Sequence, residues 1–102
     1  MTTANLLDHL QEQGYDPEGL ILGADIYDLT ASGTGTVRLC LHPDDEYRAE
    51  VHFLDRYLVE EWSVSLSPGT PDAIILATLE AAEWQLAGRR GGPVTPAQAA
   101  RA

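Results

Sequence analysis

Four residues near the middle of the chain have side chains that can bind metal ions: Cys40, His42, Asp44 and His52. Thiolate, imidazole and carboxylate groups are the ligands of zinc and related transition metals. Their spacing matches no zinc motif, and a site would require the strands of a sheet to bring three of them to one point. The sequence therefore favours polar cross-strand pairs on a solvated face, and we predict no metal and no cofactor.

Two short acidic clusters, Asp44-Asp45-Glu46 and Glu60-Glu61, are the next candidates. Grouped carboxylates can hold a hard cation, but the calcium-loop spacing D-x-[DN]-x-[DN]-G does not occur. Such runs are usually solvated loop and strand ends. The functional alternative is an acidic contact surface for a basic partner, so all five residues are candidate partner-binding residues.

Sequence motifs for catalysis do not occur. The chain has no G-x-S-x-G elbow, no Walker motif and no dinucleotide-binding glycine motif. Gly33-Thr34-Gly35 lacks the third glycine and the strand-to-helix context that would cradle a phosphate. We therefore predict that the protein is not an enzyme and has no catalytic residues.

Two helices and a set of strands must position these side chains. The first helix is expected over residues 3–13 and ends at Gly14. The second begins at Thr70-Pro71-Asp72, because threonine caps a helix, proline suits the first helical position and aspartate complements the helix dipole. It is expected to run to about Ala87 and to end at Gly88.

Between the helices, apolar and polar residues alternate with the period of a β-strand over residues 37–42, 47–53 and 62–66. The alternation predicts that Tyr47 points inward with the apolar residues of its strand. Residues 16–19 read as a turn, and residues 20–29 are compatible with either a strand or a loop.

His42-Pro43-Asp44-Asp45-Glu46 breaks the alternation, and a five-residue loop between the two central strands predicts their register. Cys40 should lie opposite Glu50, and Arg38 opposite His52, all on the solvent face. The fold class is then α+β: a two-layer sandwich in which an antiparallel meander of three or four strands is flanked by an N-terminal and a C-terminal helix. Because His9 lies near acidic residues on its helix, we expect it at the surface.

The second helix is apolar on two sides at 100° per residue. One stripe suits a core and comprises Ile75, Leu79, Ala82 and Leu86, with Glu83 on a solvated flank. A second stripe comprises Ile74, Ala77, Ala81 and Trp84. Two interpretations stay open: the first helix packs on this second stripe, or the stripe is a surface for self-association or for a partner.

Charge and composition exclude several classes of function. The chain has 16 acidic residues and six arginines, a net charge of −10, which argues against nucleic-acid binding and against an anionic membrane surface. We divide it into one acidic domain, residues 1–88 with a net charge of −13, and a flexible Gly/Pro/Ala/Arg tail, residues 89–102. The single cysteine and the lack of a signal peptide or long apolar segment predict a cytoplasmic protein.

The run from Trp62 to Ala73, WSVSLSPGTPDA, resembles the C-terminal end of an actinobacterial domain family of unknown function found on plasmids and mobile elements. Members of that family have a strand with a tryptophan, then Thr-Pro, then a helix. The resemblance covers about a third of the chain and implies no activity.

These observations predict a small acidic, non-enzymatic protein-interaction module that binds a protein partner, which can be basic, or a second copy of itself. The alternative is an inhibitor from a phage or mobile element that mimics nucleic acid and binds a nucleic-acid-binding enzyme or factor. Mimicry needs carboxylates in a row at phosphate-like spacing. The best row, Asp44, Glu46, Arg48 and Glu50, is interrupted by an arginine.

Overall fold

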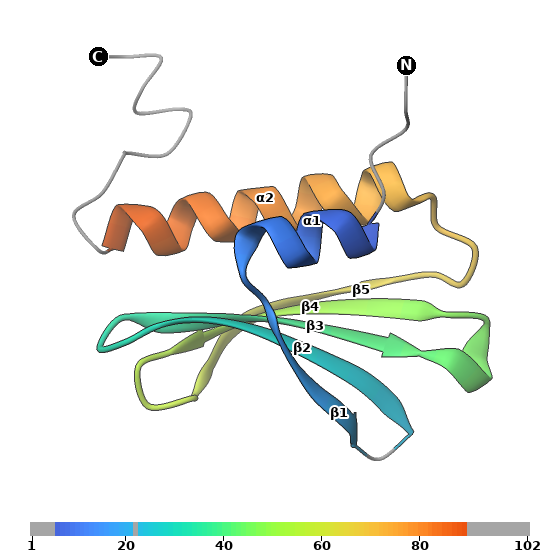
Figure 1. Cartoon of the computed structure of the whole chain (residues 1–102), viewed down its shortest axis with the longest axis horizontal. Coiled ribbons are helices and arrows are strands. Elements are labelled where there is room, and N and C mark those ends of the chain that lie inside the picture. Colours follow the sequence, from blue (N-terminus) through green and yellow to red (C-terminus); the bar gives the residue numbers. More distant parts are fainter. Residues whose placement is uncertain (1–5, 22, 90–102) are drawn as a thin grey trace.

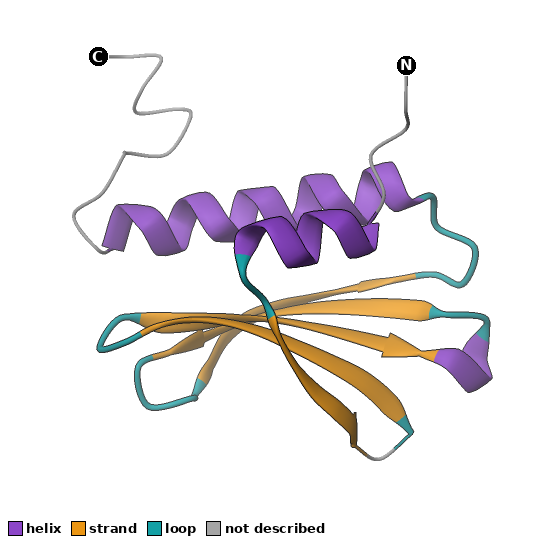
Figure 2. Cartoon of the chain, in the orientation of Figure 1, coloured by secondary structure: helices purple, strands orange, loops and turns teal. Residues whose placement is uncertain are grey.

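The protein consists of a helical layer on one face of an antiparallel sheet (Figures 1 and 2). The computed structural model describes residues 6–21 and 23–89. Helices α1 (Leu6–Gln13) and α2 (Asp72–Arg89) lie side by side and run in the same direction (Figure 1). This confirms the predicted α+β sandwich with an N-terminal and a C-terminal helix.

The sheet is a meander in which every strand pairs with the next one in the sequence. It has five strands, one more than the upper limit of the prediction. They are β1 (Asp16–Ile21), β2 (Ala24–Ala31), β3 (Gly35–His42), β4 (Arg48–Asp55) and β5 (Glu60–Leu66), and a single turn of 3₁₀ helix, η1 (Pro43–Asp45), joins β3 to β4.

The additional strands come from the segment that the sequence left undecided. Residues 16–19, which were expected to form a turn, belong to β1 and pair with β2. Gly19 has a φ of 84° and lies at a bulge in this pairing, so the strand continues through the Pro-Glu-Gly sequence. Local turn preferences are therefore overridden by hydrogen bonding to β2, which is itself held by β3.

The core lies between the helices and the inner face of the sheet. The alternation predicted for β3 and β4 is confirmed, because Val37, Leu39, Val51 and Phe53 are fully buried. They pack in one cluster with apolar residues of both helices: Leu6, Leu10, Ile75, Leu76, Leu79, Ala82 and Leu86. The prediction for Tyr47 is wrong: it precedes β4 with a φ of 57° and is exposed.

Strand β5 forms one edge of the sheet and is less buried than its neighbours. Trp62 stacks on Phe53 with the ring centroids 5.7 Å apart, and its indole N–H donates to Oε1 of Gln85 at 2.9 Å. These contacts join the edge strand to the core and to α2.

Helix α2 is longer than predicted. Gly88 does not end it, because the helix continues to Arg89. The guanidinium of Arg89 lies 4.8 Å from the centroid of the Phe53 ring and donates to both carboxylate oxygens of Glu61. These contacts hold the last helical turn against the sheet, so Arg89 belongs to the domain rather than to the predicted tail. The rest of that tail, residues 90–102, and residues 3–5 of the predicted first helix lie outside the described residues.

Candidate functional site

The outward face of α2 remains exposed. All four residues of its second apolar stripe are exposed, and the relative exposure of Ile74 and Trp84 is 50% and 47%. Of the two interpretations, packing of the first helix on this stripe is therefore wrong. The structure brings Ile74, Ala77, Ala81 and Trp84 together on one side of a single helix, as their spacing predicted.

Helix α1 instead contacts the flank of α2 that carries Glu83. The Oε2 atom of Glu83 lies 2.8 Å from Nε2 of His9 and accepts a hydrogen bond from the hydroxyl of Tyr15 at 2.7 Å. The side chains of Glu83 and His9 are only 12% and 16% exposed. The predictions of a solvated Glu83 and a surface His9 are thus wrong, because the two residues pair with each other between the helices.

The opposite face of the sheet carries a polar network. The predicted register is confirmed: Cys40 lies opposite Glu50, and Arg38 opposite His52. Arg38 also binds Asp28 of β2 through two hydrogen bonds, from Nε at 2.8 Å and from Nη2 at 2.9 Å. Asp28 is buried, so this pair gives a buried carboxylate a cationic partner.

Glu50 is the centre of that network. Its Oε2 accepts from Nη1 of Arg48 at 2.6 Å, and its Oε1 lies 3.2 Å from Nε2 of His52 and 3.4 Å from Nε2 of His42. Burial opposes the charge on this carboxyl, but the hydrogen bonds from Arg48 and His52, together with the nearby imidazole of His42, outweigh it and lower the pKa of Glu50 to about 2. Glu50 is therefore ionised at any physiological pH.

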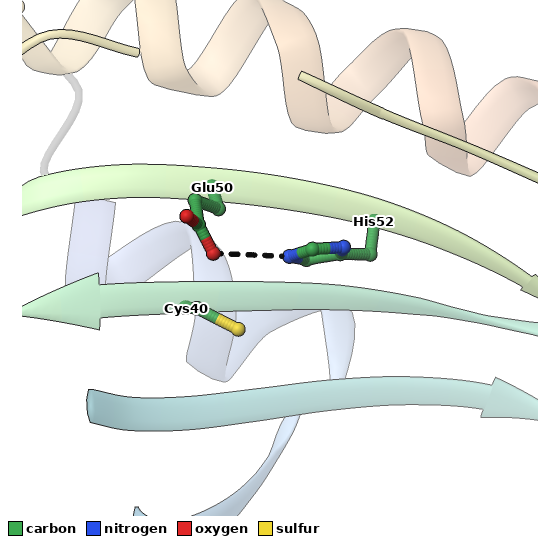
Figure 3. Close-up of side chains that lie close together, drawn as sticks. All are labelled: Cys40, Glu50 and His52. Atoms are coloured by element: carbon green, nitrogen blue, oxygen red, sulfur yellow. Dashed lines mark hydrogen bonds and ion pairs between the residues drawn. The ribbon is translucent and has the colours of Figure 1, made fainter. Parts of the chain in front are cut away.

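Cys40 lies beside this carboxylate (Figure 3). Burial and the negative charge of Glu50 raise the pKa of the Cys40 thiol to about 11, so the thiol is protonated at neutral pH. A sulfur atom in this state is a weak nucleophile.

The donor atoms of Cys40, Glu50 and His52 all lie within 4.8 Å of one another (Figure 3). The sequence suggests a ligand set of Cys40, His42, His52 and Asp44. The structure places Asp44 in η1 and brings Glu50 to the thiol instead. The predicted register already implies that Glu50 lies beside the thiol, because a residue directly opposite Cys40 must share its face of the sheet.

The two acidic clusters are exposed, but several of their charges are paired. Asp45 accepts from Nε of Arg48 at 2.7 Å, Glu60 lies 2.5 Å from Nδ1 of His52, and Glu61 binds Arg89. Asp44 and Asp45 lie in η1 and Glu46 follows it, whereas Glu60 and Glu61 begin β5.

No family model, curated protein or solved structure matches the chain. The resemblance to the actinobacterial family therefore remains a prediction. In the part of the chain that the structure describes, neither helix has the length and apolar composition needed to cross a membrane.

Proposed function

We propose that this protein is a small acidic, non-enzymatic module that works by binding another protein through the outward face of α2. The supporting observation is the exposure of Ile74, Ala77, Ala81 and Trp84 on a helix whose other large apolar residues are buried. A contiguous apolar surface on a small domain is typical of an interaction site.

The composition of this stripe suits a helix-binding surface. Trp84 offers a large apolar ring, and tryptophan is enriched among residues that dominate binding energy. Ala77 and Ala81 lie between Ile74 and Trp84 in the sequence and let the backbone of a partner approach closely. The stripe spans eleven residues, or about 15 Å along the helix, which is roughly three turns.

Charge favours a basic partner over a second copy. Residues 6–89 contain all 16 acidic residues and four arginines, a net charge of −12. A stable interface needs about 800 Å² on each side, more than one narrow stripe supplies, so the contact must extend onto the polar rim that includes Glu80. A partner with an apolar centre and basic flanks complements that rim, whereas a second copy brings a second acidic body.

No observation favours the nucleic-acid mimic over the binding module. Arg48 interrupts the acidic row and engages two of its neighbours, Asp45 and Glu50. Three of the five clustered carboxylates are paired with Arg48, His52 or Arg89 rather than free to imitate phosphates.

The proposal is tested by capturing partners from the native host with the full chain at low and high salt. The matched variants are Trp84→Ala and Tyr57→Ala, which removes an aromatic ring that is 71% exposed in the turn between β4 and β5. We expect a basic protein, identified by mass spectrometry, that the wild type and Tyr57→Ala retain and Trp84→Ala loses.

Light scattering on the purified chain distinguishes a basic partner from a second copy as the molecule that binds the α2 stripe. A dimeric mass that reverts to the monomer in Trp84→Ala would identify a second copy as the occupant, and would refute the basic partner. A monomer without any partner that depends on Trp84 would refute the proposed function.

A further inference from the structure

Two adjacent strands present four metal-binding side chains on the outer face of the sheet, the face away from the helices. Cys40 and His42 are two residues apart on β3, and Glu50 and His52 are two residues apart on β4. Side chains two residues apart on a strand share a face, and the pairing of Cys40 with Glu50 puts both pairs side by side. The fold therefore collects one sulfur, two nitrogens and one oxygen.

The two contacts of Glu50 with the histidines have the spacing of ligands around a small tetrahedral ion. Zinc binds sulfur at about 2.3 Å and nitrogen or oxygen at about 2.0–2.2 Å, so neighbouring ligand atoms lie roughly 3.3–3.8 Å apart. In the structure, Oε1 of Glu50 is 3.2 Å from Nε2 of His52 and 3.4 Å from Nε2 of His42. The sulfur of Cys40 lies within 4.8 Å of the Glu50 and His52 donor atoms, whereas His42 is outside this group and approaches it through Glu50, so the His42 ring must turn for all four to share one ion.

The nitrogen of His42 lacks a hydrogen-bond partner. Its Nε2 is buried from solvent and makes no hydrogen bond with any described residue, although it lies near Oε1 of Glu50. A buried polar atom in this state is costly unless something binds it. A cation between His42 and Glu50 would satisfy it.

The orientation of His52 also suits a metal ligand. An ionised carboxylate can only accept, so Nδ1 of His52 donates its proton to Glu60 at 2.5 Å. When the ring is doubly protonated, Nε2 donates to Oε1 of Glu50; in the neutral ring the same Nε2 carries a lone pair, which can bind a cation that Oε1 also binds. Histidine ligands of metals are commonly fixed in this way by a carboxylate on the other ring nitrogen.

Glu50 is held so that one carboxylate oxygen points toward the histidines. Arg48 binds Oε2, and Oε1 faces the two histidines. Binding of the ion would release the proton of the Cys40 thiol to solvent, and the resulting thiolate and the Glu50 carboxylate would together balance the charge of a divalent ion.

From this geometry we propose that the outer face of the sheet binds one zinc ion through four ligands: Cys40, His42, Glu50 and His52. The mixed set of sulfur, nitrogen and oxygen donors matches the preferences of zinc better than those of magnesium or calcium, which take oxygen. The site is on the opposite face of the molecule from the α2 stripe. A result against zinc binding therefore leaves the proposed partner binding untouched, and the reverse also holds.

Titration of the full chain with Co²⁺, a spectroscopic substitute for zinc, tests the site. Cys40 is the only cysteine in the chain, so a sulfur-to-cobalt charge-transfer band reports on this residue alone. We expect a saturable band with one ion per chain, displaced by Zn²⁺, and a higher melting temperature with Zn²⁺ present.

Three variants and one control locate the ion. Cys40→Ser should abolish the band, and His52→Gln should weaken cobalt binding at least 10-fold. Glu60→Gln, which releases the His52 ring, should weaken it by about 10–100-fold. His9→Gln makes the same change as His52→Gln at a histidine in the helical layer and should leave the affinity unchanged.

Circular dichroism of each variant without metal confirms that it is folded. If the folded wild type gives no band in excess Co²⁺, or if Zn²⁺ affinity is the same in wild type, Cys40→Ser and His52→Gln, the proposal is overturned.

Discussion

Tyr15 donates its hydroxyl to the carboxylate of Glu83 at 2.7 Å, across 68 positions of the sequence. The contact joins the segment that follows α1 to the flank of α2, and His9 binds the same oxygen. Because α1 packs on the flank of α2 that carries Glu83, the outward stripe of α2 is left uncovered. The position of one carboxylate thus decides which face of the longer helix is available for binding.

The stability of the protein should fall steeply above pH 10 because of Tyr15. Burial, together with the hydrogen bond to Glu83, raises the pKa of Tyr15 far above its ordinary value near 10. The folded chain then keeps a proton that the unfolded chain releases, so stability is complete below pH 10 and falls by about 1.4 kcal/mol per pH unit above it. Tyr15→Phe should cost about 1.5 kcal/mol at pH 7 and should lose this alkaline slope.

Urea unfolding between pH 7 and pH 11 measures both effects of Tyr15→Phe. Tyr57→Phe is the control, because the Tyr57 ring is exposed. An equal alkaline slope in wild type and Tyr15→Phe would contradict the structure at this position.

The two tryptophans should differ strongly in their contribution to folding. Trp84 is about half exposed, so Trp84→Ala should change the free energy of unfolding by less than about 1 kcal/mol. Trp62 stacks on buried Phe53 and donates to Gln85, so Trp62→Ala should cost about 3 kcal/mol. Denaturant unfolding followed by circular dichroism compares the two. A large loss in Trp84→Ala would mean that the stripe is part of the core.

Arg38 and Asp28 should be strongly coupled. Arg38→Met leaves the buried Asp28 carboxylate without its two hydrogen bonds and should cost about 2 kcal/mol, since Arg38 is itself partly exposed. Asp28→Asn combined with Arg38→Met should cost clearly less than the sum of the single changes. A double-mutant cycle from thermal or urea unfolding measures this coupling, and additive effects would argue against the pair.

Two glycines should respond in opposite ways to alanine. A Cβ at Gly35 would lie 2.7 Å from the backbone oxygen of Leu54, so Gly35→Ala must displace β3 from β4 and should cost more than about 1 kcal/mol. A Cβ at Gly88 meets nothing within 4 Å in a helical position, so Gly88→Ala should gain about 0.5 kcal/mol. Melting temperatures that shift in the same direction for both variants would contradict the backbone described for one of them.

The sequence alone determined the features that depend on short periods. The two-residue alternation placed Cys40 opposite Glu50, because neighbouring strands joined by a short connection have few registers that bury one face. The helical period likewise separated Ile75 and Leu79 from Trp84 on α2. These patterns are local, so they can be read from the sequence without knowledge of the rest of the fold.

Tertiary structure alone decided which segments far apart in the sequence contact one another. Residues 16–21 and 24–31 form two strands because the pairing of β1 with β2, and of β2 with β3, outweighs the local turn preference. The open stripe on α2 depends on where α1 docks, and Glu83, His9 and Tyr15 set that position through contacts over more than 60 residues. The surroundings of Glu50 depend on three neighbours from both central strands. No local pattern encodes these contacts, because each forms only once the layers have packed.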